Sequence, residues 1–439
     1  MKGKVKIGLV CLLRKTFDYE SAWKEFKSKE AELKKIENVD WVIIDEPVIE
    51  VEEAKKAADK LSSELVDGVI ITSGTFHLGH LALIIEEKLK KPVHLWGLPE
   101  APYDGGKIRY NSACGVHLNK SNLFKAGVKF VHHVVAPLPD INWIDALRMV
   151  KAMEIAKIAL VGSRAQGFFN LAFDELTSFK STGAMLEYYQ IADMYNQEVS
   201  DEEAKKYLDE IKGFFNCDDV NEEQIKRVAK LCVSIKKFVD SNHIDALAVR
   251  CWPEYAQSYG IAPCAAMSII AKEKYLLACE GDAMLALSML ACKALDIETP
   301  YSADFSQVDF EEDTALLWHC GVAPCNLTNK KCTPTLDTYF AGGKGVTTGF
   351  VLKEGDFNIV RIDSALGKTR IFAEKGKAVY MDKLLKGTYA KGKFDKGVKA
   401  VYDTLLDNGF AHHVVMVYGD YIEKFRLLCK IKGWEWIEA

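Results

Sequence analysis

Two carboxylates, Glu280 and Asp304, stand in apolar stretches of this sequence. Glu280 lies in ACEGDAM, and the run AMLALSMLACKAL that follows predicts a helix buried on nearly all sides. Asp304 lies in TPYSADF, at the end of a short strand predicted after that helix. A charge in such surroundings is costly unless it is paired or binds a metal ion. Considered singly, Glu280 is also explained as a helix cap and Asp304 as a turn residue.

Three histidines lie in similar surroundings. His319 lies in the apolar run TALLWHCG, and His412 and His413 begin the segment HHVVMVY. A single buried histidine is usually a core residue with satisfied hydrogen bonds. Adjacent strand residues point to opposite faces, so only one of the pair should face inward from an undistorted strand. Together with the carboxylates, these imidazoles form a mixed oxygen and nitrogen set that suits Mn²⁺, with Co²⁺ and Mg²⁺ as alternatives.

The elements that must position these residues fall into three predicted domains. Over residues 1–155, strand and helix signals alternate from VKIGLVCLL to KPVHLWGLP, which predicts a doubly wound parallel sheet. A second doubly wound, Rossmann-like α/β domain is predicted over 156–297, with strands at AKIALV and HIDALAVR. Over 298–439 the pattern changes to antiparallel strands with turns at Glu354-Gly355 and Gly367, which predicts a β-rich barrel or sandwich domain.

The composition argues against several classes of protein. The chain has 439 residues, a formal net charge of -5 and 49% hydrophobic residues, which argues against broad binding to nucleic acids or anionic membranes. We expect a cytoplasmic protein, because no apolar stretch reaches the roughly 18 residues of a membrane span and MKGKVKIGLVCLL is no signal peptide. The twelve cysteines should then be reduced. The densest group, Cys320, Cys325 and Cys332, lacks the C-x-x-C pairs of a structural zinc site.

The acidic segments resemble the L-fucose isomerase and L-arabinose isomerase superfamily of metal-dependent aldose–ketose isomerases. In L-fucose isomerases, a Glu in an A-T-E-A-D-M type segment begins an apolar helix, an Asp follows twenty-four positions later, and a late His completes a Mn²⁺ site. Glu280 and Asp304 have the same context and the same spacing of 24. AHHVVMVYG is similar to the A-H-H segment of L-arabinose isomerases, whose second histidine corresponds to His413, and WHCG at His319 matches their H-x-G segment.

The resemblance implies a divalent metal site and a sugar substrate. Glu280, Asp304 and His413 would be metal ligands, and His319 would be either a fourth ligand or a contact to the sugar. It also implies a homotrimer or homohexamer whose pockets lie between subunits. The residues expected to contact the substrate are Arg14, Phe76, His77, Trp96, Arg164 and His412.

The implied reaction moves a proton between C1 and C2 of a sugar through a cis-enediolate. A divalent cation that chelates both oxygens would stabilise this intermediate, and Glu280 and Asp304 would exchange the protons. The sequence has no evident phosphate-cradling loop, so a free sugar is the first expectation. A sugar with a sulfonate or another acidic group is the alternative, with Arg14 or Arg164 as its clamp.

Two other classes of function compete with this interpretation. A non-enzymatic sugar-binding protein could also use two α/β lobes, but it would need no metal. An NAD-dependent dehydrogenase could use VGSRAQGF as its nucleotide loop, but Gly162 and Gly167 do not form G-x-G-x-x-G.

Overall fold

The computed structural model describes residues 1–338 and 344–439, which form two compact units. Unit 1 comprises Met1–Lys151 and Arg426–Gly433, and unit 2 comprises Ala152–Phe425 and Trp434–Ala439. The predicted domain boundaries near residues 155 and 297 stay predictions. Among the described residues, we find no helix that combines the length and the apolar character needed to span a membrane.

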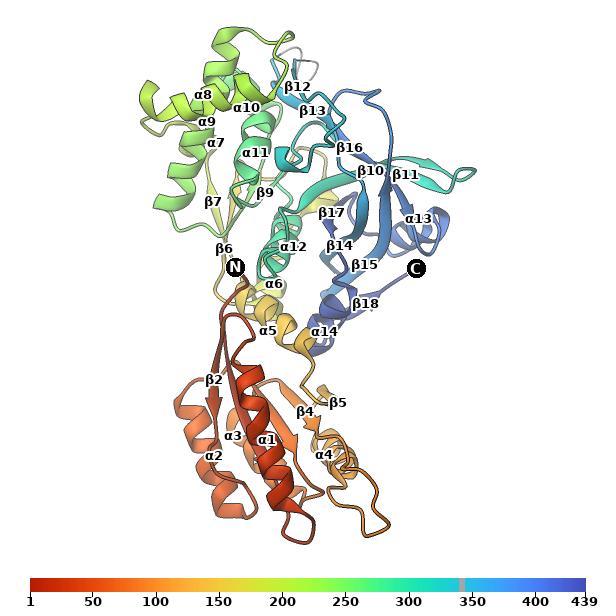
Figure 1. Ribbon diagram of the computed structural model, residues 1–439. Coiled ribbons are helices and arrows are strands. Elements are labelled where there is room, and N and C mark those ends of the chain that lie inside the picture. The colour runs from red at the N-terminus through yellow and green to blue at the C-terminus, as the bar shows by residue number, and fades with distance from the viewer. Residues whose placement is uncertain (339–343) are drawn as a thin grey trace. The chain divides into compact units, whose positions relative to one another are not determined.

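Unit 1 contains a five-stranded parallel sheet in the order β2-β1-β3-β4-β5 (Figure 1). The predicted parallel α/β sheet is therefore confirmed here. Its central strands are nearly continuous apolar runs because helices cover both faces. The elements are β1 (Val5–Leu12), α1 (Tyr19–Leu33), β2 (Val39–Ile43), α2 (Val51–Ser63), β3 (Gly68–Ser73), α3 (His80–Leu89), β4 (Val93–Gly97), α4 (Ser112–Lys125), β5 (Val131–Val135) and α5 (Ile141–Met153), the last ending in unit 2.

Unit 2 begins with a four-stranded parallel sheet in the order β7-β6-β8-β9. The sequence pattern predicted HIDALAVR as the next strand after AKIALV, which was wrong. The chain first forms β7, which pairs with β6 at the edge of the sheet. The segment MLEYY of β7 is partly exposed throughout and shows no clear alternation, so it gave no strand signal. The elements are β6 (Lys157–Val161), η1 (Phe169–Leu171), α6 (Glu175–Thr182), β7 (Met185–Tyr189), α7 (Ile191–Tyr195), α8 (Asp201–Phe214), α9 (Glu222–Ser241), β8 (Ala246–Val249), α10 (Glu254–Ser258), α11 (Cys264–Ala271), β9 (Leu277–Ala278) and α12 (Ala283–Lys293).

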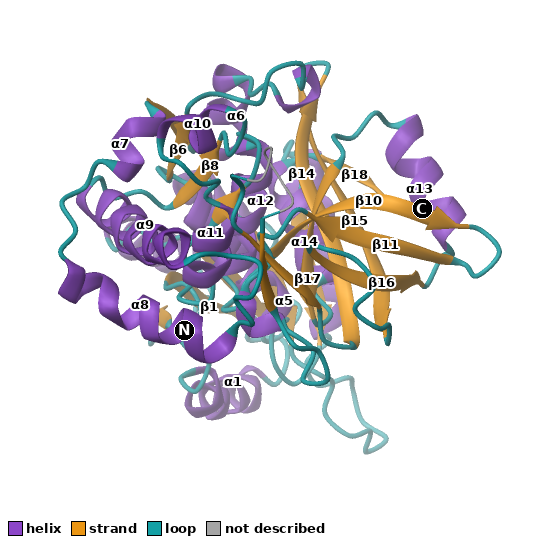
Figure 2. Ribbon diagram, turned by 90° about the horizontal axis from the view of Figure 1, so that it is seen from above, coloured by secondary structure: helices purple, strands orange, loops and turns teal. Residues whose placement is uncertain are grey.

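The rest of unit 2 is a nine-stranded sheet in the order β12-β13-β16-β11-β10-β17-β14-β15-β18 (Figure 2). Because β15 also pairs with β16, six antiparallel strands close into a ring, β16-β11-β10-β17-β14-β15. The predicted turn at Gly367 joins β14 to its antiparallel partner β15. The predicted turn at Glu354-Gly355 lies at the start of β14, but β13 before it pairs with β12 and β16 and not with β14. The elements are β10 (Tyr301–Asp309), β11 (Thr314–His319), η2 (Cys325–Leu327), β12 (Thr335–Asp337), β13 (Thr347–Val351), β14 (Gly355–Ala365), β15 (Lys368–Val379), β16 (Thr388–Phe394), α13 (Val398–Asp407), β17 (His413–Tyr418), α14 (Ile422–Lys432), which crosses into unit 1, and β18 (Glu435–Ile437).

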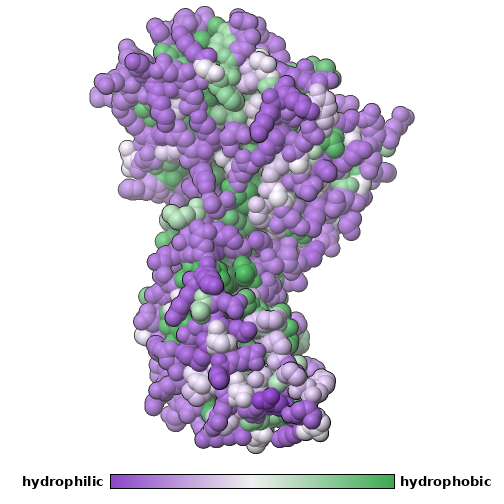
Figure 3. Space-filling model, viewed as in Figure 1, coloured by the Kyte–Doolittle hydropathy of each residue, from purple (hydrophilic) through white to green (hydrophobic). Residues whose placement is uncertain are grey.

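Helix α12 lies between the two sheets of unit 2 (Figure 1). It contacts β6, β8 and β9 on one side and β14 and β17 on the other, and every residue from Ala283 to Cys292 is buried. The predicted all-round burial of this helix is therefore confirmed. In contrast to this buried helix, hydrophilic residues cover most of the surface visible in Figure 3.

Candidate active site

The loop between β9 and α12 holds Glu280 in a fixed position. Glu280 and Gly281 both have left-handed backbones, with φ of 59° and 76°. The carbonyl of Glu280 accepts from the N–H of Ala165 at 2.9 Å. The helix cap is Asp282, which accepts from the N–H of Leu285 at 2.9 Å. Capping therefore does not explain Glu280, whose side chain is 14% exposed and turned toward the histidines.

Gly281 should tolerate no side chain in this loop. A Cβ at Gly281 would lie 2.4 Å from the carbonyl oxygen of Ser163 and 2.6 Å from Cα of Arg164. Together with its positive φ, this predicts that Gly281→Ala lowers the free energy of unfolding by about 2–4 kcal/mol in chemical denaturation. Gly167→Ala is the matched control, because Gly167 has φ of 87° but nothing within 4 Å of its Cβ position. Equal losses in the two variants would contradict the proposed contact.

Asp304 and His413 face each other across paired strands. They are register partners in the antiparallel pair β10–β17, and Asp304 Oδ1 lies 3.6 Å from His413 Nε2. The predicted short strand ending at Asp304 was too short, since β10 continues past a register shift between Phe305 and Gln307. The next strand, β11, ends at His319 beside them. The closed ring of strands therefore gathers two histidines and one carboxylate from distant parts of the chain.

Several atoms at this point are buried without a hydrogen-bond partner in the described structure. These atoms are Asp304 Oδ1, His319 Nε2 and His413 Nε2. The ligand atoms of this trio lie within 4.8 Å of one another, and Glu280 Oε2 lies 3.3 Å from His413 Nε2. Converging oxygen and nitrogen atoms of this kind fit a divalent cation such as Mn²⁺. The chemistry of these residues therefore fits a divalent metal centre.

Hydrogen bonds on the Nδ1 side of the ring fix the orientation of His413. Its Nδ1 lies 3.0 Å from Asp282 Oδ2, and Arg361 Nη1 donates to the same carboxylate oxygen at 2.8 Å. Arg361 also donates to the backbone carbonyl of His413 at 3.0 Å. All three side chains are fully buried. With Nδ1–H donating to Asp282, the neutral imidazole directs its Nε2 lone pair toward Glu280 and Asp304, which is the arrangement typical of a metal-ligating histidine.

At His319, in contrast to His413, the ring Nδ1 accepts a hydrogen bond. The backbone N–H of Cys320 donates to His319 Nδ1 at 2.9 Å, so Nδ1 carries the lone pair. The neutral imidazole then holds its proton on Nε2 and presents a donor to the site. A protonated Nε2 cannot ligate a metal. Of the two roles predicted for His319, this geometry favours the contact to the sugar.

Negative charge dominates the centre. Burial alone would raise the pKa of Glu280, but the adjacent imidazoles of His412 and His413 hold it well below its usual range. Burial alone would lower the pKa of His413, but Asp282 and Glu280 raise it to about 9. The carboxylates thus stay ionised and favour protonation of the neighbouring imidazoles. A divalent cation bound between them would take the place of those protons.

His412 and Trp252 complete the surroundings of Glu280. His412 lies just before β17 with a 38% exposed side chain, and its Nε2 is 3.4 Å from Glu280 Oε2. Trp252 Nε1 donates to Glu280 Oε1 at 3.2 Å. The ring of Phe168 packs edge-on against both, at 6.1 Å from Trp252 and 5.2 Å from His412. Each carboxylate oxygen of Glu280 thus has a donor or imidazole partner.

The structure brings together five of the ten predicted site residues, and a sixth lies on a neighbouring loop. Glu280, Asp304, His319, His412 and His413 meet at one point of unit 2. Arg164 follows β6, one residue before Ala165, which bonds the Glu280 carbonyl. No sequence pattern predicted a role for Asp282, Arg361 or Trp252, which contact these residues. The only signal for Arg361 was a lone charge in the apolar strand FNIVRID.

The remaining four predicted residues lie in unit 1. Arg14 and Phe76 follow β1 and β3, where the strand order of the sheet reverses and ligands of such sheets usually bind. His77 is fully buried, with Nε2 3.1 Å from Ser73 Oγ. Trp96 is also fully buried and donates to a backbone carbonyl. Their substrate roles stay predictions, and the burial of His77 and Trp96 within this unit counts against them.

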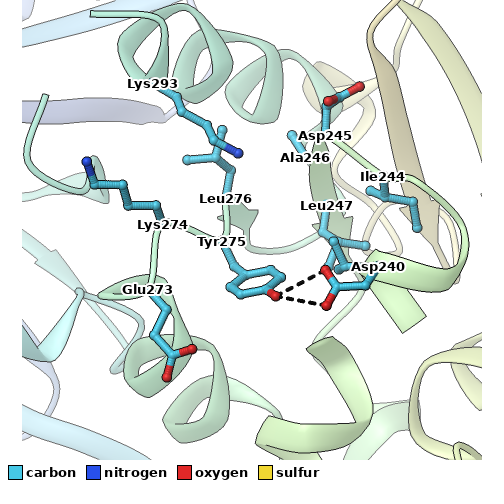
Figure 4. A pocket seen from close by; sticks show the side chains of 11 residues that line it. Asp240, Ile244, Asp245, Ala246, Leu247, Glu273, Lys274, Tyr275, Leu276 and Lys293 are labelled. Carbon is cyan, nitrogen blue, oxygen red and sulfur yellow. Dashed lines mark hydrogen bonds between the residues drawn. The ribbon is translucent and has the colours of Figure 1, made fainter. Parts of the chain in front are cut away.

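A separate pocket of about 330 Å³ opens elsewhere in unit 2 (Figure 4). Most of its lining residues immediately precede β8 and β9 or begin β8, and Tyr275 there donates to Asp240 at 3.1 Å. Ligands of parallel α/β sheets bind beyond the carboxyl ends of the strands, where Glu280 follows β9. This pocket lies at the amino ends, so we do not assign the reaction to it.

Comparison with known proteins identifies relatives along most of the chain. The models "L-fucose isomerase, C-terminal domain" and "Fucose/sulfoquinovose isomerase, N-terminal domain" match residues 317–439 and 8–142. A sulfoquinovose isomerase of Priestia megaterium (strain ATCC 12872 / QMB1551) is 28% identical, covering 93% of this chain and 94% of that protein. One from Clostridium sp. (strain MSTE9) is 26% identical, covering 85% and 86%.

A solved ABC transporter solute-binding protein of Burkholderia multivorans overlaps 66% of this chain and 93% of its own. Its sequence identity is 9% and its TM-score is 0.19. The amino-terminal match covers the parallel sheet of unit 1, and the carboxyl-terminal match includes His319 and His413. The protein is therefore an aldose–ketose isomerase. It belongs to the fucose/sulfoquinovose isomerase family.

Proposed function

We propose that this protein interconverts sulfoquinovose, an aldose that carries a sulfonate, and the corresponding ketose. The single observation that supports the reaction is the convergence of Glu280 Oε2 and Asp304 Oδ1 on His413 Nε2, at 3.3 and 3.6 Å. The relatives named sulfoquinovose isomerases, matched over up to 93% of the chain, support the substrate. A neutral deoxy sugar is the second candidate, because one of the matching models carries the name of L-fucose isomerase.

We propose that Glu280, Asp304 and His413 hold a Mn²⁺ ion. When bound, such an ion acts as a Lewis acid that stabilises negative charge developing on the C1 and C2 oxygens of the sugar. The two carboxylates carry the protons between C1 and C2, and the hydrogen bond from Trp252 to Glu280 Oε1 orients one of them. His319 donates from Nε2 to a sugar oxygen.

We propose Arg164 as a contact to the sulfonate. Its guanidinium stacks on the exposed ring of Phe169 at 4.7 Å and uses one donor for the carbonyl of Ala165 at 3.2 Å. A guanidinium has five N–H donors, so several remain for an anion. The backbone N–H of the next residue, Ala165, donates to the carbonyl of Glu280, so the loop that carries Arg164 contacts the loop that carries Glu280.

The test is an isomerisation assay of metal-depleted protein resupplied with Mn²⁺, Co²⁺ or Mg²⁺. The substrates are sulfoquinovose, D-glucose as the matched sugar without a sulfonate, L-fucose and L-arabinose. We expect turnover of sulfoquinovose that vanishes on chelation and returns best with Mn²⁺ or Co²⁺, and kcat/KM at least about 100-fold lower with D-glucose. Turnover of L-fucose alone would support the second candidate, and full activity of protein shown to be metal-free would refute the metal centre.

Variants separate the substrate assignment from the reaction. Arg164→Ala should raise KM for sulfoquinovose by roughly 10-fold or more, because a charge-assisted hydrogen bond contributes about 1.5–3 kcal/mol. Lys180→Ala removes an exposed positive charge from α6 and should leave KM unchanged. Equal effects of the two variants would refute the clamp without touching the isomerase proposal.

We also propose that the protein assembles as a homotrimer or homohexamer, with substrate contacts such as Arg14 supplied by a neighbouring subunit. Each subunit of that assembly would consist of the three predicted domains, of which the last is the β-rich barrel. Sedimentation velocity combined with kinetics at the same concentrations tests this proposal. A fully active monomer would refute it.

A further inference from the structure

Four cysteine thiols from four separate segments meet in the core of unit 2. Cys251 follows β8, Cys279 follows β9, Cys320 follows β11, and Cys264 is the first residue of α11. Three of them are 0% exposed and Cys320 is 4% exposed. These cysteines form no C-x-x-C pairs, so no sequence motif predicted the group.

The thiols lie close together. Cys251 Sγ and Cys279 Sγ are 2.9 Å apart. Cys264 and Cys279 each interact with the other three thiols. Cys279 Sγ and Cys320 Sγ lie within 4.8 Å of each other. The four sulfurs therefore form one cluster, and His319 Nδ1 lies at its edge, 3.3 Å from Cys320 Sγ.

We propose that these four thiols bind a zinc ion, separate from the centre formed by Glu280, Asp304 and His413. Four sulfurs held 2.3 Å from a tetrahedral zinc lie about 3.8 Å from one another, so shifts of about 1 Å suffice to complete the site. All-sulfur sites select Zn²⁺, whereas carboxylate and imidazole sites suit harder ions. On binding, the four thiols release their protons to solvent. A disulfide would use only two of the four sulfurs, and every cysteine is a free thiol in this structure.

The position of the thiols gives the ion a clear role. Cys251 is followed by Trp252, Cys279 by Glu280, and Cys320 is preceded by His319. Each of these neighbours has its side chain at the active site. A zinc ion would therefore tie together the loops that carry them and hold their backbones in register. It positions these residues and does not contact the substrate.

The first experiment measures metal in the wild-type protein. The untagged chain is produced in medium with added zinc and manganese, treated with EDTA while folded, and analysed by mass spectrometry for metals. We expect about one zinc per chain to survive, because the thiols are buried, and to be released only when the protein is unfolded. Cobalt-substituted protein should show the intense thiolate-to-cobalt absorption of tetrahedral sulfur ligation. Wild-type protein without zinc and without that absorption would overturn the proposal.

Variants locate the ion. Cys264→Ser should lose the chelator-resistant zinc, and Cys292→Ser, which changes a buried thiol of α12 outside the group, should keep it. His413→Ala should also keep the zinc, because its target is the other centre. Zinc that persists in Cys264→Ser, or that disappears in His413→Ala, would overturn the assignment to the four thiols. The cobalt absorption of wild-type protein decides the question even if Cys264→Ser does not fold.

Discussion

Replacing His413 by alanine should abolish turnover and tight binding of the divalent cation together. His413 is fully buried, and its Nε2 is the atom on which Glu280 and Asp304 converge. Because removal of a residue that only supports a ligand costs about 10- to 100-fold in metal affinity, removal of the ligand itself should cost more than about 100-fold. Calorimetric titration with Mn²⁺ and the kcat at saturating Mn²⁺ measure the two effects.

The neighbouring histidines provide the contrast. His319→Ala should raise KM for the sugar at full metal occupancy, because the Cys320 N–H occupies Nδ1 and leaves a donor at Nε2. His412 lies outside β17 and is partly exposed, so His412→Ala should cost less in metal affinity than His413→Ala. Lower metal occupancy in His319→Ala would restore the role of fourth ligand. If His413→Ala kept both its metal and its kcat, the assignment of the centre would be wrong.

The sequence patterns correctly predicted helix α12 and the parallel sheet of unit 1, because both depend on local hydrophobic periodicity. The apolar run after Glu280 became the buried helix α12, and the alternating strand and helix signals of the first domain became the parallel sheet of unit 1. Strand β7 was missed because an edge strand buries little and needs no apolar alternation. Closure of the ring through β15 and β16 depends on strand pairing over long sequence separations, which periodicity does not record.

The site was predictable in its residue types and not in its supports. Glu280, Asp304 and the histidines stood out as polar residues in apolar segments, and the resemblance supplied their grouping. Asp282 is an acidic residue at a helix start, and it caps α12. Its carboxylate also contacts His413 and Arg361, which are 131 and 79 positions away in the sequence. The four thiols were hidden for the same reason, since each comes from a different loop.

The buried pair of Asp282 and Arg361 should be the most sensitive support of the fold. Both side chains are 0% exposed and bond at 2.8 and 3.3 Å. Asp363 lies 3.6 Å from the same guanidinium and offsets part of its charge. Breaking a buried ion pair by removing one partner costs about 3–5 kcal/mol, because the other charge stays buried. Arg361→Met and Asp282→Asn should each lower the free energy of unfolding by that amount in chemical denaturation.

The two single variants should differ at the metal centre. Asp282→Asn removes the carboxylate that fixes the Nδ1–H tautomer of His413 and should weaken Mn²⁺ binding by about 10- to 100-fold. Arg361→Met leaves that hydrogen bond in place and should weaken Mn²⁺ binding less. As a control, Asp403→Asn breaks the exposed ion pair with Lys399 on α13 and should cost no more than about 1 kcal/mol.

The double variant Asp282→Asn/Arg361→Met decides whether the charges themselves account for the loss. With both charges gone, no uncompensated ion remains in the core, so the double variant should be less destabilised than the sum of the single variants by at least about 1 kcal/mol. It should still bind Mn²⁺ as weakly as Asp282→Asn alone, because the support of His413 is not restored. Additive losses of stability would mean that packing, and not the ion pair, makes these residues necessary. Recovery of metal affinity in the double variant would mean that Asp282 does not orient His413.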